Sequence, residues 1–209
     1  MSSRARLILA VAALIALAGT VLATIAASSQ DQAAEPAAVV EGPESPFEGA
    51  VRPEGLRGDF SLRNQDGDLV RTADLRGKVI VITPTYTTCE ESCPIAVQQV
   101  RGALDDMSED DLSRVRAFAL SVDPANDTPD SAQEFLLSRR VRGYLDYLLG
   151  TRRELQPVWR QYGFAPQTDS QEHNSYIVLL DGRGHQRVGF PLQYVTPETL
   201  RHDIELLLR

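Results

Sequence analysis

Two cysteines are the residues of this chain whose type and spacing could do chemistry. Cys89 and Cys93 are its only cysteines, and Pro94 follows directly. A short β-branched run precedes the pair and an apolar helical stripe follows it, so the pair is expected at the N-terminus of a helix. The partial positive charge of a helix N-terminus favours thiolate over thiol. The thiolate is the form that binds metals and attacks disulfides.

Four roles are open to a C-x-x-x-C pair. A purely structural disulfide is disfavoured, because closing so short a loop stabilises by only about 2 kcal/mol in the chain-entropy model. Dithiol–disulfide exchange commonly uses C-x-x-C, and Glu90 and Glu91 beside the thiols oppose thiolate formation. A third role is peroxide reduction at Cys89, although Tyr86 stands where peroxiredoxins place Thr or Ser. Metal binding by both sulfurs is the fourth.

Metal binding calls for further ligands, and the chain has three histidines. His202 on the expected last helix and His185 in a Gly-rich turn are expected at the surface. His173 comes just before an expected strand over 176–180. If the sheet is thioredoxin-like, the loop that carries His173 faces the cysteine loop. With both cysteines it would form a set whose thiolates favour Cu(I).

The elements that must position the pair are a strand, a helix and a second strand. Residues 79–82 form a continuous β-branched run, which is typical of a buried strand. Apolar residues at three- and four-residue spacing predict a helix over 94–107. Cys93 is expected to cap this helix, because a residue before proline disfavours helical geometry. A second buried strand over 116–122 should complete a parallel, right-handed crossover.

The rest of the chain predicts a mixed sheet flanked by helices. The expected elements are an N-terminal β-hairpin turning at Asp66-Gly67, helices opening at Thr128-Pro129, Thr151 and Thr196-Pro197, and a hairpin over 176–190. This order is an α/β layer arrangement compatible with a thioredoxin-like fold.

Four further residues have ordinary structural interpretations. Asp123 and Asp127 precede a proline and a Thr-Pro pair, where aspartate serves turns. Trp159 and Tyr162 lie on an expected helix, and large aromatic residues on helices usually pack in the core.

The N-terminus predicts export and a membrane anchor. Arg4 and Arg6 precede an uncharged run over 7–27, which as a helix would span about 31 Å, close to a bilayer core. The arginines should stay cytoplasmic. We therefore expect an anchor over 1–27 in the cytoplasmic membrane, a flexible linker over 28–50 and a domain over 51–209 on the periplasmic side. A cleaved signal peptide is the alternative.

The composition excludes one class of partner. The net charge is −8 and the isoelectric point about 4.9. An acidic domain repels phosphate backbones, so nucleic acid is not expected as a partner.

Four motifs in order resemble the Sco/SenC family over roughly residues 50–209. They are Tyr86-Thr-Thr-Cys89-Glu-Glu-Ser-Cys93-Pro94, Ser121-Val-Asp123-Pro124-Ala-Asn-Asp127-Thr128-Pro129, Trp159-Arg-Gln-Tyr162-Gly163-Phe164, and His173-Asn-Ser175 followed by Leu180-Asp-Gly182. Thr83 and Pro84 depart from the family pattern, which usually has aromatic residues there.

The resemblance implies a thioredoxin-like fold and copper bound by Cys89, Cys93 and His173. It also implies supply of copper to the Cu-A centre in subunit II of cytochrome c oxidase, or reduction of the thiols of that centre. Another periplasmic copper chaperone is a candidate donor. The alternative function is a thiol–disulfide oxidoreductase in which Cys89 and Cys93 form the redox pair and His173 is dispensable.

Overall fold

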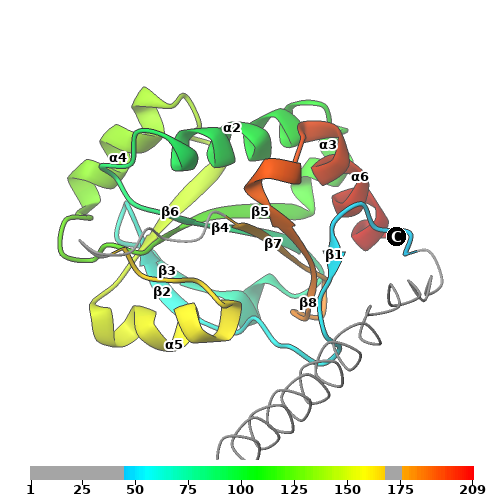
Figure 1. The fold of residues 1–209 in the computed structure, drawn as a ribbon, viewed down its shortest axis with the longest axis horizontal. Coiled ribbons are helices and arrows are strands. Elements are labelled where there is room, and N and C mark those ends of the chain that lie inside the picture. The colour runs from blue at the N-terminus through cyan, green and yellow to red at the C-terminus, as the bar shows by residue number, and fades with distance from the viewer. Residues whose placement is uncertain (1–44, 168–175) are drawn as a thin grey trace, which may run out of the picture. The chain divides into compact units, whose positions relative to one another are not determined.

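A computed structural model describes residues 45–167 and 176–209. Residues 45–209 form one compact unit. Its described residues build an eight-stranded sheet in the order β1-β8-β7-β4-β5-β6-β2-β3, shown in Figure 1. The strands are β1 Ala50–Val51, β2 Ser61–Asn64, β3 Leu69–Arg71, β4 Val79–Thr85, β5 Val115–Ser121, β6 Leu145–Leu149, β7 Tyr176–Leu180 and β8 Gln186–Pro191. The helices are α2 Ser92–Asp105, α3 Glu109–Ser113, α4 Pro129–Ser138, α5 Arg152–Tyr162 and α6 Pro197–Leu208, with short 3₁₀ turns at Thr72–Leu75 and Leu192–Tyr194.

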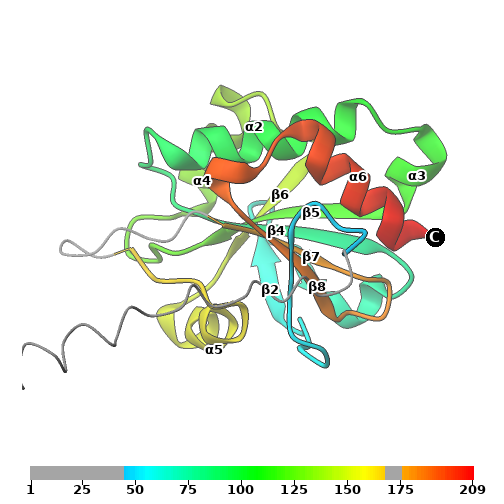
Figure 2. The same ribbon diagram turned by 45° about the vertical axis from the view of Figure 1, so that its right-hand side comes forward.

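The sheet lies between two helical layers. Helices α2, α4 and α6 cover one face and α5 covers the other, as Figure 2 shows. Strand β4 is buried along its whole length. Its residues alternate between the two cores, with Val79 and Val81 in the α2 core and Ile80 and Ile82 in the α5 core. This is why the strand reads as an unbroken apolar run rather than an alternating one.

The expected crossover is confirmed. Strand β4 pairs with β5 in parallel from Val79↔Val115 to Thr85↔Ser121, and α2 connects the two. Three expected helix starts are also confirmed, because Thr128, Thr151 and Thr196 each make a capping box. Together these elements form the mixed α/β sheet flanked by helices that the sequence predicts.

The structure differs from the sequence prediction at β6 and at α3. Strand β6 pairs in parallel with β5 and antiparallel with β2, whereas no strand was expected over 145–149. So short an apolar run cannot be distinguished from part of a helix by its periodicity. Helix α3 is a single exposed turn capped by Ser108. It buries no residue, so it leaves no hydrophobic pattern.

The helix after the cysteines begins earlier than expected. Helix α2 starts at Ser92, so Cys93 lies in its first turn and does not cap it. Pro94 is tolerated at the third position because the first four N–H groups of a helix have no intrahelical partner. The prediction of Cys93 as N-cap is therefore wrong.

The N-terminal part of the described chain is docked on the domain. Strand β1 pairs with β8, and the Glu48 and Gly49 amides donate to the buried Asp203 carboxylate at 2.9 Å each. The docked segment thus begins before the expected domain start at residue 51. The expected anchor over 1–27 lies outside the described residues, as does most of the expected linker. Within 45–167 and 176–209, no helix is long and apolar enough to cross a membrane.

Candidate functional site

The cysteine loop leaves the sheet at the carboxyl end of β4. The amide of Val79 and the carbonyl of Thr85 both bond toward β5, so the backbone nitrogen of Pro84, one residue off in register, faces β7. The pairing of β4 with β7 ends at Ile82. Pro84 therefore lies where the strand needs no donor on that side, and the strand continues to Thr85.

The two cysteines contact each other through the start of α2. The Cys93 amide donates to the Cys89 sulfur at 3.2 Å, and the Ser92 hydroxyl lies 3.7 Å from the same sulfur. The Cys89 sulfur thus takes the acceptor place of a helix cap. Both cysteines are in the reduced form, and no hydrogen-bonding side chain caps α2 at Glu91.

The environment separates the acidities of the two thiols. Hydrogen bonding from the Cys93 thiol, reinforced by the Cys93 amide and the Ser92 and Tyr86 hydroxyls, lowers the pKa of Cys89 from 9.0 to about 5. Burial, followed by the adjacent Cys89 sulfur, raises the pKa of Cys93. The pair therefore holds one proton near neutral pH, with Cys89 as the thiolate and Cys93 as its donor.

The cysteine pair is buried. Cys89 and Cys93 are only 2% and 1% exposed and pack in the α2 core. Because both sulfurs are buried, the cysteine loop must move before a ligand can reach them.

Asp127 is a buried hub beneath the cysteine loop. Its carboxylate accepts from the Thr87 amide at 2.8 Å, the Ser121 hydroxyl at 2.6 Å and the Tyr147 hydroxyl at 3.0 Å. Burial raises its pKa, and these donors partly offset the effect. Asp127 therefore joins the cysteine loop to the end of β5 and to the middle of β6, and is more than a turn residue.

The role of Asp127 as a shared acceptor was not predicted from the sequence, because one of its hydrogen-bond donors comes from an unpredicted strand. Tyr147 lies in the middle of β6, and its hydroxyl also reaches the Thr85 carbonyl at 3.1 Å. A polar aromatic residue within the apolar run over 145–149 is a signal for a buried hydroxyl that needs a partner. Unless strand β6 is predicted, the partner of this hydroxyl cannot be identified.

Asp123 closes a turn and also borders a cavity beside the cysteine loop. Its carboxylate accepts from the Asn126 side chain at 2.8 Å, as expected of a turn residue. The cavity is about 770 Å³, and Tyr86 and Thr88 of the cysteine loop line it together with Asp123 and Arg152.

Trp159 and Tyr162 are core residues, as expected. Their side chains are 3% and 1% exposed. The Trp159 indole donates to the Ser121 carbonyl at 2.8 Å, and the Tyr162 hydroxyl donates to the Gly58 carbonyl at 2.7 Å. The α5 layer thus supports the end of β5 from which Ser121 reaches Asp127.

The structure places two of the three histidines, and neither is grouped with the cysteines. His173 lies outside the described residues. His185 lies in the β7–β8 turn, at the start of β4 rather than its end. His202 is exposed beside Asp203 on α6. Among the described residues, no three Cys, His, Asp or Glu side chains are grouped so as to hold a metal.

The chain is similar to one family of proteins over most of its length. Residues 49–209 match the family model described as SCO1/SenC. The structure of copper-bound ScoI from Bradyrhizobium japonicum is 30% identical, with a TM-score of 0.62 over 73% of this chain and 99% of that one. The mitochondrial SCO1 homolog 1 of Arabidopsis thaliana is 28% identical over 68% of this chain, but the match spans only 40% of that protein.

A third similarity concerns the fold. BsSco is 20% identical, with a TM-score of 0.65 over 76% of this chain and 97% of that one. It is described as having a disulfide switch and as a member of the Sco family of cytochrome c oxidase assembly proteins.

Proposed function

The chain belongs to the SCO1/SenC family, and on that premise we propose that it is an extracytoplasmic copper-binding protein. Cys89, Cys93 and His173 bind the copper as cargo. The acceptor is the Cu-A centre in subunit II of cytochrome c oxidase. Residues 1–27 anchor the chain in the cytoplasmic membrane, with the folded domain on the periplasmic side.

The observation that carries this proposal is the preorganised sulfur pair. The Cys93 amide holds the Cys89 sulfur at 3.2 Å at the N-terminus of α2, and the lowered pKa of Cys89 supplies a thiolate at neutral pH. Thiolates select soft metals such as Cu(I). The copper-bound relative from Bradyrhizobium japonicum supports this choice of metal.

The proton on Cys93 couples metal binding to pH. A thiol must lose its proton to become a ligand. Cys89 is already ionised, so binding of Cu(I) releases the Cys93 proton. Once the metal is bound, its positive charge replaces the proton that the sulfur pair shared. Neutral His173 is proposed as the third ligand, because imidazole accepts copper in either oxidation state.

Transfer follows from the same ligand set. Three ligands leave a coordination position of copper free, so that once the cysteine loop has moved, a target with more sulfur ligands can replace them one at a time. Oxidation of the dithiol to a Cys89–Cys93 disulfide removes both thiolates and would switch binding off.

The proposal is tested by a Cu(I) competition titration on the reduced full chain. We expect one tight equivalent, its loss in Cys93→Ser, and at least about tenfold weaker binding in His173→Ala. The exposed His202 provides the matched control, since His202→Ala should bind as the wild type does. Binding that is equal in His173→Ala and His202→Ala would contradict the ligand set.

The second candidate function is thiol–disulfide exchange, and the split acidity of the pair favours it. The Cys89 thiolate would attack a client disulfide, form a mixed disulfide and release one client thiolate. Cys93 would lose its proton and attack the Cys89 sulfur, releasing the second client thiolate. Two electrons pass to the client and the chain keeps the disulfide. This function predicts reduction of a client disulfide at the same rate in His173→Ala as in the wild type.

A further inference from the structure

A basic corner lies at the end of the sheet opposite the cysteines. It consists of Arg57, Arg76, Lys78, Arg183 and Arg187. Gly77 pairs with Gly182 at 2.8 Å, and Gly58 pairs with Gly184 at 2.9 Å. The segments that carry all five cations therefore meet at the β7–β8 turn.

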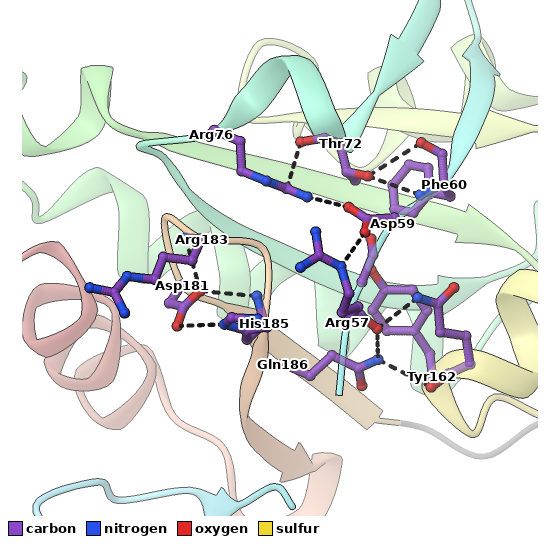
Figure 3. A network of polar contacts seen from close by, with 12 residues as sticks. Arg57, Asp59, Phe60, Thr72, Arg76, Tyr162, Asp181, Arg183, His185 and Gln186 are labelled. Atoms are coloured by element: carbon purple, nitrogen blue, oxygen red, sulfur yellow. Dashed lines mark hydrogen bonds and ion pairs between the residues drawn. The ribbon is translucent and has the colours of Figure 1, made fainter. Parts of the chain in front are cut away.

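The corner carries more positive than negative charge. Asp59 pairs with Arg57 at 2.6 Å and with Arg76, while Asp181 pairs with Arg187 at 3.2 Å. These two carboxylates face the four arginines of the corner, while Lys78 donates to the Ser113 carbonyl at the end of the acidic helix α3. Arg183 is exposed, and Figure 3 shows its side chain extending away from the Arg57–Asp59 pair.

The corner and the cysteine loop lie at opposite ends of β4. Leu180 pairs with Ile80 near the start of this strand, so the β7–β8 turn lies beside that start. The cysteine loop follows the last residue, Thr85. Seven residues of strand separate the two ends by roughly 20 Å.

The chain enters the domain at the basic corner. Phe47 lines a hollow of about 400 Å³ together with Arg183, His185 and Arg187 of the β7–β8 turn. From there the segment is fixed by Asp203 and by β1, and the Arg52 amide donates to the Arg187 carbonyl at 2.9 Å. The attachment point is therefore held rigidly against the corner.

Only 17 residues separate this entry point from the proposed anchor, since the anchor ends at residue 27 and the described chain starts at Ser45. A chain of 17 residues spans at most about 60 Å, so the corner is within reach of the bilayer. A positive surface beside a membrane attracts anionic lipid headgroups.

From this placement we infer that the basic corner is a membrane-docking surface for anionic phospholipid headgroups. It turns the cysteine loop away from the bilayer, toward a partner in the periplasm. The acidic Glu90 and Glu91 at the far end would be repelled by the same headgroups, which favours the same orientation. The inference rests on the membrane anchor of the proposed function and not on its copper site.

The test uses the full chain in nanodiscs of phosphatidylcholine alone or with phosphatidylglycerol added. Phenylglyoxal modifies exposed arginines, and mass spectrometry gives the rate at each. We expect Arg183 and Arg187 to react at least about threefold more slowly in the anionic discs, and about 0.5 M NaCl to abolish the difference. The exposed Arg152 and Arg153 begin α5 at the cysteine end of the domain, so they are the internal control and should react equally in both discs.

A variant pair tests the charge directly. Arg183→Gln/Arg187→Gln should remove the lipid-dependent protection of Arg57 and Arg76, whereas Arg152→Gln/Arg153→Gln, with the same loss of charge, should retain it. Equal rates at Arg183 and Arg187 in the two discs, with the chain retained after a 1 M salt wash, would overturn the docking surface and leave the anchor standing. A chain washed off both discs would overturn the anchor and, with it, the orientation.

Discussion

The Cys93 amide donates to the Cys89 sulfur across one turn at the start of α2, at 3.2 Å. Cys89 precedes the helix, but through this contact its sulfur serves as a hydrogen-bond acceptor for the helix N-terminus. The same positive end that would bind an anion stabilises the Cys89 thiolate. The acidic neighbours Glu90 and Glu91 do not prevent this, because both are exposed to water, which screens their charges.

The first prediction concerns the pH dependence of alkylation at Cys89. Only the thiolate reacts with iodoacetamide, so its rate should rise with an inflection near pH 5, in line with the lowered pKa. Removal of the thiol donor in Cys93→Ala should move this inflection toward 9. An inflection between 8 and 9 in the wild type would contradict the account.

The free energy of unfolding should also depend on the ionisation of Cys89. The folded-state pKa of Cys89 lies below its value of 9.0 in the unfolded chain. Its contribution to the free energy of unfolding is therefore present in full above pH 9 and lost as the pH falls toward 5. Urea unfolding of the reduced protein between pH 5 and 9 measures it. Cys89→Ala should flatten this rise, and a wild-type slope that survives the substitution would assign the effect to other groups.

Asp127 should matter for both stability and copper binding. Asp127→Ala leaves the Thr87 amide and the Ser121 hydroxyl without their acceptor and the Tyr147 hydroxyl with the Thr85 carbonyl alone. This should cost about 2 kcal/mol in the free energy of unfolding. Because Thr87 lies in the cysteine loop, Cu(I) affinity should fall as well. Asp130→Ala, an exposed acid on α4, should change stability by no more than about 0.5 kcal/mol. Equal effects of the two substitutions would remove Asp127 from the site.

Tyr147 and Asp127 should be energetically coupled. Tyr147→Phe removes a hydroxyl that contacts both Asp127 and the Thr85 carbonyl, at an expected cost of about 1 kcal/mol. A double-mutant cycle with Asp127→Asn should give a coupling energy above about 0.5 kcal/mol. Simple additivity would mean that the two groups act independently.

Gly49 should control how firmly the N-terminal segment is held. A Cβ atom at this position would lie 2.4 Å from a methyl group of Val188 and 2.8 Å from the Phe190 ring. Gly49→Ala should therefore loosen the segment over 45–58 and speed tryptic cleavage after Arg57, which Gly58 follows. Glu48→Ala keeps the backbone amide that binds Asp203 and should leave cleavage unchanged. Equal cleavage in both variants would show that the close packing at Gly49 does not hold the segment.

The sequence predicted those parts of the fold whose signals are local. The β4-α2-β5 crossover follows from an apolar run and a helical stripe, and three helix starts follow from Thr caps. The role of Asp127 could not be predicted, because it depends on Tyr147 from a distant strand whose five residues have no clear period. The burial of Cys89 and Cys93 likewise arises from packing against the α2 core, which the spacing of two cysteines does not encode.

The ligand set is the central claim, and X-ray absorption at the copper edge of the Cu(I)-loaded, reduced full chain tests it most directly. The account predicts two sulfur scatterers from Cys89 and Cys93 and one imidazole nitrogen. The nitrogen should vanish in His173→Ala and persist in His185→Ala and His202→Ala. An imidazole signal that persists in His173→Ala, or a wild-type spectrum with sulfur alone, would contradict it.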